Sequence, residues 1–233
     1  MAELSRFDKL KKSLAASAGD VVFGMEDGTV SIFGLVLGVA ATTNDSKTVL
    51  IAGASGACAA AVSMMAGTYL DVETSLDEAR TFNALLAAEI KQDPHAVVGR
   101  IADRMHSVGM NDVETADIVA FVRSEPALLR GVAAAMTSPA ATAVQSPLAH
   151  ALWMLVADFL SAAIPIVPFA LTPVHNARWI SSGITLALLI SLGVGRARIG
   201  RKPVGRTVIE TVLIGVSAAL AGVAIGLIIT HSL

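Results

Sequence analysis

Residues 207–230 read TVIETVLIGVSAALAGVAIGLIIT, and Glu210 is the only charged residue in this stretch. A transmembrane α-helix needs about 20 consecutive, mostly apolar residues, so the segment is long enough to cross a bilayer. Four other blocks are similarly apolar: VVFGMEDGTVSIFGLVLGVAAT (21–42), TVLIAGASGACAAAVSMMAGTYL (48–70), PLAHALWMLVADFLSAAIPIVPFAL (147–171) and RWISSGITLALLISLGVG (178–195). The sequence therefore predicts an all-α polytopic membrane protein with five transmembrane helices.

The composition of the whole chain supports this class. Of the 233 residues, 54% are hydrophobic and 15% are charged, whereas a typical soluble domain carries about 25% charged residues. The mean hydropathy is +0.68. A single cysteine, Cys58, excludes an internal disulfide framework, and the net charge of −2 gives no basis for a nucleic-acid partner. The composition predicts a lipid bilayer as the surrounding medium.

The charged residues are concentrated between the second and third apolar blocks. Positions 71–137 hold 17 of the 36 charged residues. This distribution predicts a short segment 1–20, two transmembrane helices in 21–70, a small helical insert at 71–146 and three transmembrane helices in 147–233. Within the insert, the first helix is expected to continue from the second span to residue 92 and to end before Pro94. Further helices are expected over 94–108, over 112–123 and, with Ser124 as N-cap, up to Met136.

Two basic clusters predict the orientation in the membrane. Lysine and arginine near the ends of spans mark the cytosolic side. With five spans, residues 1–20, the insert and the 196–206 loop share one side, which we expect to be the cytosol, with the C-terminus outside. The short basic N-terminal segment and the alanine-rich composition favour a bacterial cell membrane. The clusters comprise Arg6, Lys9, Lys11, Lys12, Arg196, Arg198, Arg201, Lys202 and Arg206.

Acidic residues inside the predicted spans are the first functional signal. A charged side chain at the bilayer centre costs at least about 2.5 kcal/mol, so such residues face a cavity or the bundle interior. Asp20 and Asp27 share one helix face, about 10 Å apart along the axis, although Asp20 could instead cap the first span. Asp158 lies within the third span. Met64, in the second, either supplies a soft ligand for a transition metal or fills a gap in the core.

These residues resemble a known family. The segment Asp20–Gly28 (DVVFGMEDG), the SMMAG stretch that begins at Ser63, and Pro165 and Pro168 in the third span are similar to the vacuolar iron transporter (VIT) family. The five-span layout with an insert between spans two and three is also similar. The resemblance covers nearly the whole chain, and the two-aspartate motif is its most specific part.

The resemblance implies a homodimer with a transport path between the first spans of the two subunits. It also implies proton-coupled export of Fe²⁺, and often of Mn²⁺, from the cytosol. Asp20 and Asp27 match the family's pathway acids, and Met64 matches its pathway methionine. Protonation of the same carboxylates would couple ion release to proton entry.

The insert departs from the family pattern. The family carries a run of glutamates where the second span continues into the cytosol. Ala79, Leu85 and Leu86 stand where such glutamates are expected. The remaining candidate ligands of the insert are Glu73, Asp77, Glu78 and Glu89.

The prediction from sequence is thus a proton-coupled exporter of Fe²⁺ or Mn²⁺, with the metal ion as cargo and no resident cofactor. Two alternatives stay open because the insert lacks its glutamates. One is a transport-inactive membrane scaffold or sensor, and the other is a transporter of a non-metal solute on the same fold. The sequence contains no Ser-His-Asp arrangement, phosphate loop or nucleotide fingerprint, so no enzyme is predicted.

Overall fold

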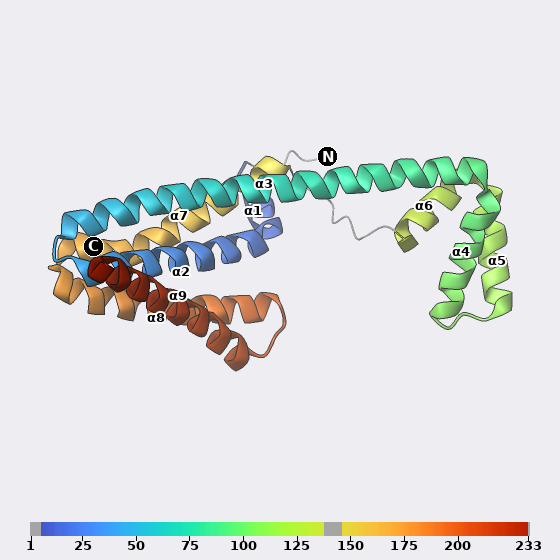
Figure 1. The fold of residues 1–233 in the computed structure, drawn as a ribbon. Coiled ribbons are helices and arrows are strands. Elements are labelled where there is room, and N and C mark those ends of the chain that lie inside the picture. Colours follow the sequence, from blue (N-terminus) through green and yellow to red (C-terminus); the bar gives the residue numbers. More distant parts are fainter. Residues whose placement is uncertain (1–5, 138–145, 233) are drawn as a thin grey trace. The chain divides into compact units, whose positions relative to one another are not determined.

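A computed structural model describes residues 6–137 and 146–232, and within these ranges the chain is built from helices without strands (Figure 1). The helices are α1 (Arg6–Ala16), α2 (Ala18–Thr42), α3 (Ser46–Gln92), α4 (Pro94–Ser107), α5 (Asp112–Ser124), α6 (Pro126–Thr137), α7 (Pro147–Leu171), α8 (Val174–Ile199) and α9 (Val204–Ser232). Five of them, α2, α3, α7, α8 and α9, are long and apolar enough to cross a membrane. The predicted all-α class with five candidate spans is therefore confirmed.

The chain divides into two compact units, Met1–Leu70 with Gln145–Leu233, and Asp71–Val144. The first unit holds the candidate spans, and α2 is its central helix because it packs against α7, α8 and α9. Buried apolar residues between α2, α3, α7 and α8 form its core, among them Ile32, Val36, Val49, Phe169 and Val174. This arrangement places the acid-bearing helix α2 inside the bundle.

Glycine lets α2 and α9 cross in close contact. A Cβ atom built on Gly222 would meet the carbonyl oxygen of Gly34, and one on Gly38 would lie 2.6 Å from the carbonyl oxygen of Gly222. Real Cβ atoms do not approach backbone so closely, so any larger residue at Gly222 would push the helices apart. Small residues at helix interfaces allow this close approach in membranes.

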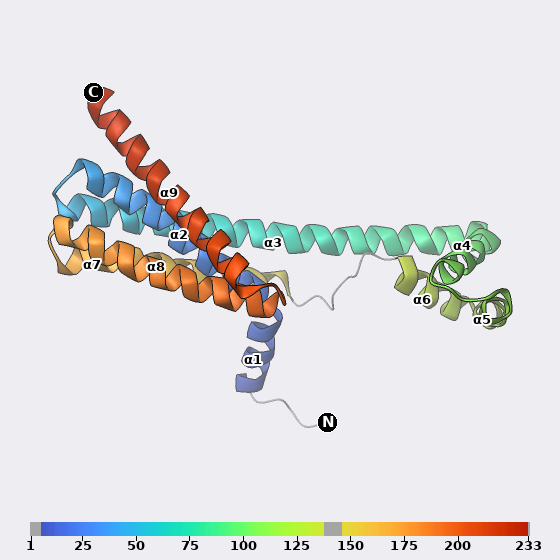
Figure 2. The same ribbon diagram turned by 90° about the horizontal axis from the view of Figure 1, so that it is seen from below.

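The two basic clusters lie at the same end of the first unit. Both views place α1, the first turn of α2 and the α8–α9 turn at one end, and the C-terminal end of α9 at the other (Figures 1 and 2). The helix α1 was not expected from the sequence. It is joined to the bundle by a hydrogen bond that Trp153 Nε1 donates to Ser13 Oγ over 3.1 Å.

The second unit is a small helical unit with its own core. Its core residues come from α3, α4, α5 and α6 and include Leu86, Val97, Ile101 and Val122. The first of its helices is the continuation of α3 to Gln92, as predicted. Asp93 caps α4 by accepting hydrogen bonds from two backbone N–H groups, which completes the predicted break before Pro94.

One predicted helix cap in this unit is wrong. Asn111 caps α5 in a reciprocal capping box with Glu114. Ser124, predicted to cap the next helix, is instead the last residue of α5. Its hydroxyl donates to the Phe121 carbonyl oxygen over 2.7 Å, so it satisfies the helix before it and not the one after.

Candidate functional site

Asp20 lies in the first turn of α2 and pairs with a histidine from α7. His150 Nδ1 is 2.6 Å from Asp20 Oδ2, and both side chains are partly buried. The N-cap position of α2 is Ser17, and no side chain caps the helix there. The alternative role of Asp20 as the N-cap of the first span is therefore wrong, because its carboxylate is directed to another helix.

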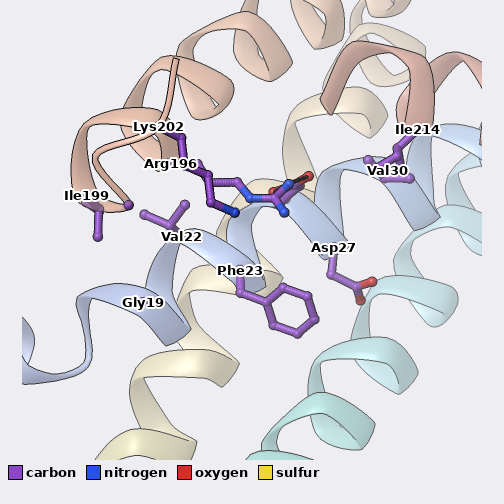
Figure 3. A pocket seen from close by; sticks show the side chains of 11 residues that line it. Gly19, Val22, Phe23, Asp27, Val30, Arg196, Ile199, Lys202 and Ile214 are labelled. Carbon is purple, nitrogen blue, oxygen red and sulfur yellow. Dashed lines mark hydrogen bonds and ion pairs between the residues drawn. The ribbon is translucent and has the colours of Figure 1, made fainter. Parts of the chain in front are cut away.

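Asp27 is half-buried in α2, two turns further along. It lines a recess of about 370 Å³ together with Phe23, Val30 and residues of α8, α9 and the turn between them. Figure 3 shows Asp27 pointing away from Arg196 and Lys202, which lie on the other side of α2. Within residues 6–137 and 146–232, Asp27 forms no hydrogen bond or ion pair. A carboxylate held without a partner inside an apolar span is free to bind a cation or a proton.

A third acid of α2, Glu26, is held by an ion pair that sequence reasoning missed. Only 8% of Glu26 is exposed. Arg196 from α8 donates to Glu26 Oε1 over 3.1 Å, and the Thr211 hydroxyl from α9 donates to the same oxygen over 3.3 Å. The pair joins three helices beside the Asp27 recess. It neutralises Glu26, so Asp27 is the acid of this segment that stays available.

We expect the Arg196→Ala variant to be less stable than the wild type by about 1–3 kcal/mol, because a buried acceptor loses its charged donor. The measurement is thermal unfolding of the full-length protein in detergent. Changing Glu26 to Gln in the same chain should recover part of the loss, since no buried charge then remains unpaired.

Arg206→Ala is the matched control. Arg206 pairs with Glu210 one turn away, and both side chains are exposed. An exposed ion pair of this kind contributes little to stability, so this variant should have a melting temperature close to that of the wild type. Equal losses for Arg196→Ala and Arg206→Ala would contradict the assigned role of the Glu26 pair.

Asp158 is the most buried acid of the bundle, with 0% of its surface exposed. It lies in α7 against Gly28 of α2, where a Cβ atom would be 2.9 Å from Asp158 Oδ1 and 2.8 Å from Ser161 Oγ. Gly28 therefore creates the space that brings α7 to the acid-bearing face of α2. Asp27 adjoins Gly28 in the chain, so the two acids lie on neighbouring helices at the same level of the bundle.

Met64 and the insert acids lie on α3. Met64 is partly buried on the apolar part of that helix. Further along, Arg80 contacts Asp77 at 2.8 Å and Glu73 at 3.9 Å, while Glu78 is exposed. In the part of the chain that the structure describes, no group of three or more His, Cys, Asp or Glu side chains is arranged to hold a metal ion.

Glu89, the insert acid nearest to the family pattern, is paired with Arg100 of α4. Both terminal nitrogens of the guanidinium group donate to the carboxylate, Nη1 to Oε1 and Nη2 to Oε2, the second over 2.7 Å. These hydrogen bonds favour the ionised acid, so they hold the pKa of Glu89 below its ordinary value. The bidentate contact makes Glu89 a link between two helices, and a metal ion would compete with Arg100 for it.

The pairing predicts how Glu89 titrates. In the wild type its carboxyl should ionise below the ordinary glutamate range, and in Arg100→Gln the midpoint should move up towards that range. Any stability that the pair contributes is present at neutral pH and is lost as the pH falls through the lowered pKa. Carbon-13 NMR of labelled glutamate side chains in the full-length protein measures the midpoint, with Glu89→Gln to assign the signal. Identical midpoints in wild type and Arg100→Gln would contradict the pairing.

Two further site residues that sequence reasoning missed, His150 and Met154, come from the start of α7. His150 meets Asp20, and Met154 Sδ lies 2.6 Å from where a Cβ of Gly24 would be. With Asp158, these residues are spaced four apart in the sequence, which places them on one helix face. That spacing was the available signal, because it puts three ligand-type side chains in a row along one apolar span.

The chain is similar to known proteins over most of its length. The sequence profile described as the VIT family matches residues 18–227 of the chain. The protein named vacuolar iron transporter 1 of Oryza sativa subsp. japonica is 28% identical over 209 residues, covering 87% of this chain and 81% of the relative.

Two further plant relatives match over similar lengths. Vacuolar iron transporter 1 of Arabidopsis thaliana is 27% identical over 219 residues, covering 91% of this chain and 86% of the relative. Vacuolar iron transporter of Centaurea cyanus is 28% identical over 212 residues, covering 89% and 86%. With five apolar helices, aspartates within the first of them and a family match over nearly its whole length, the chain belongs to the VIT family.

Proposed function

We propose that this protein transports a divalent transition-metal ion, Fe²⁺ or Mn²⁺, out of the cytosol in exchange for protons. The observation that carries the proposal is Asp27, an acid in a candidate span that lines a recess and has no partner among the described residues. The family match supports metal as the cargo, since the relatives are named as iron transporters. Because the relatives are named as transporters, we propose no enzymatic activity for this chain.

The donor types suit a first-row ion. We propose Asp27 as the central ligand and proton acceptor, Asp20 as an entry or second ligand, and Met64 as a soft ligand that favours transition metals. Carboxylate oxygen together with a thioether suits Fe²⁺ or Mn²⁺ better than Ca²⁺ or Mg²⁺, which prefer oxygen alone. Because each carboxylate binds either a proton or the metal, proton entry would displace the ion.

We propose that the protein is an integral multi-pass protein with residues 1–20 and the insert in the cytosol and the C-terminus outside. The placement of α1 and the α8–α9 turn at one end of the bundle supports a common side for both basic clusters, and the positive-inside rule assigns that side to the cytosol. The relatives are plant proteins named for the vacuole and give the expected bacterial cell membrane no support.

A homodimer is part of the same proposal. The surface of α2 around Asp27 is open, with Phe23 56% exposed, so the helix presents a face that a second copy could cover. The insert has an accessory role in this scheme. Its candidate ligands are acids that Arg80 and Arg100 contact, together with the exposed Glu78: Glu73, Asp77, Glu78 and Glu89.

A flux assay in proteoliposomes tests the proposed function. Fe²⁺, Mn²⁺, Co²⁺ and Zn²⁺ are offered in turn, without oxygen for Fe²⁺, and with and without a pH gradient. We expect Fe²⁺ or Mn²⁺ to enter vesicles with protein and not empty ones, faster when the gradient drives protons the opposite way. If no metal enters the vesicles, metal transport is rejected, and a scaffold, a sensor or a transporter of a non-metal solute remains as the explanation. If metal enters at the same rate with and without the pH gradient, proton coupling is rejected.

A further inference from the structure

One face of α7 carries three side chains of the kinds that bind transition metals. His150, Met154 and Asp158 supply an imidazole, a thioether and a carboxylate, and each is four residues from the next. Residues four apart lie above one another on a helix, separated by about 6 Å along the axis. The row therefore follows α7 into the apolar part of the bundle.

This row faces α2 at matching intervals. At one end His150 Nδ1 meets Asp20 Oδ2 at 2.6 Å. One turn further, Met154 packs where Gly24 has no side chain, and Met154 itself is buried. The seam between the two helices thus begins at a candidate entry acid and leads inward along side chains that bind soft or borderline metal ions.

Asp158 ends the row, and its side chain is a buried acid without a partner among the described residues. It is completely buried, and neither carboxylate oxygen has a hydrogen-bond partner in the part of the chain described. Oδ1 is directed at the space beside Gly28. An unpaired carboxylate buried away from water is strongly unfavourable, so this group needs a proton or a cation to be retained inside a membrane helix.

Asp27 is the neighbouring acid on α2, because it adjoins Gly28, whose Cβ position lies 2.9 Å from Asp158 Oδ1. It follows Glu26, which Arg196 and Thr211 already satisfy, and it has no partner of its own among the described residues. Two unpaired carboxylates on adjoining helices repel each other unless one of them binds a proton or both bind one cation. Together the two acids can therefore supply two anionic ligands for one divalent ion.

We propose that Asp158 is a further ligand of the transported ion, shared with Asp27, so that α7 contributes to the metal path of each subunit. The inference rests on the proposed function, because the ion that the two acids share is the ion that the protein is proposed to transport. The two carboxylates, with the Met154 thioether one turn away on α7, would form a site with few ligands. Such a site binds less tightly than a closed structural site, which suits an ion that must leave again.

The rival explanation is that Asp158 stays protonated and only fills space. Asp158→Asn separates the two, because an amide has the size of a protonated acid but cannot supply an anionic ligand. Binding of Co²⁺ to the full-length protein in detergent is followed by visible absorption and by titration calorimetry. We expect Asp158→Asn to weaken Co²⁺ binding by more than about 10-fold, because loss of a group that only orients a ligand already weakens binding by about 10- to 100-fold. The matched control is Asp117→Asn on the exposed face of α5, which should bind like the wild type.

The double variant Asp27→Asn/Asp158→Asn should bind little more weakly than either single variant, since both acids serve one ion. If the amide at 158 disturbs folding, Asp158→Ser removes the carboxylate with a smaller side chain and gives the same comparison. Wild-type Co²⁺ affinity in Asp158→Asn, with binding lost in Asp27→Asn, would overturn this inference and leave the proposed function standing. Absence of binding by the wild type would instead reject the proposed function.

Discussion

The Asp27→Ala variant is expected to fold, to reach the membrane and to lose metal transport. Asp27 is half-buried within α2 and its carboxylate has no partner in the described chain, so its removal deletes no hydrogen bond or ion pair that holds the helices together. Removing a group that only orients a ligand already lowers metal affinity by about 10- to 100-fold, and removal of the ligand itself should exceed this. Expression in metal-sensitive cells measures the effect, with growth in excess Fe²⁺ or Mn²⁺ as the readout.

The matched control for this experiment is Asp117→Ala in the second unit, an exposed acid for which no ligand role is proposed. It should protect cells as well as the wild type does. Membrane fractions must contain equal amounts of all variants. Full protection by Asp27→Ala at equal abundance would reject the proposed role of Asp27 as central ligand.

The Gly222→Ala variant is expected to show the largest loss of stability. Its new Cβ would meet the Gly34 carbonyl oxygen and lie 2.8 Å from the Gly34 carbonyl carbon, so the contact is with backbone and cannot be relieved by rotating a side chain. Overpacking costs typically 1–3 kcal/mol, and the α2–α9 crossing should reach the upper part of that range. The measurement is the melting temperature of the detergent-solubilised protein.

Gly183→Ala provides the comparison. Gly183 lies in α8, and a Cβ there meets nothing within 4 Å. Alanine is favoured over glycine in a helix by about 1 kcal/mol, so this variant should be as stable as the wild type or slightly more so. If Gly222→Ala has the same melting temperature as Gly183→Ala and the wild type, the close backbone crossing of α2 and α9 is contradicted.

The fold was predictable because its signals are strong and local. Five long apolar runs and one charged stretch determine the number of candidate spans and the position of the helical unit between them. The break at Asp93 and Pro94 and the capping residue Asn111 are likewise local. Ser124 was misassigned because a serine hydroxyl can bond to the preceding helix as readily as it can cap the next one.

The site was predictable only in part. Asp27, Asp20 and Asp158 stand out because charge inside an apolar run is costly. Their partners could not be found in the same way, because pairing depends on which helices meet. His150 with Asp20 joins residues 130 apart, and Arg196 with Glu26 joins residues 170 apart. The glycines at 24 and 28 show which face of α2 receives α7, and this became visible only once Met154 and Asp158 were placed against them.

The most direct test of a metal path through α2 is Fe²⁺ entry into proteoliposomes, measured side by side for the wild type and Asp27→Ala. Vesicles of equal protein content are loaded with an iron-quenched fluorophore, kept free of oxygen and given the same pH gradient. We expect rapid quenching with the wild type and a rate near that of empty vesicles with Asp27→Ala. Equal rates for the two proteins, or no quenching with the wild type, would contradict it.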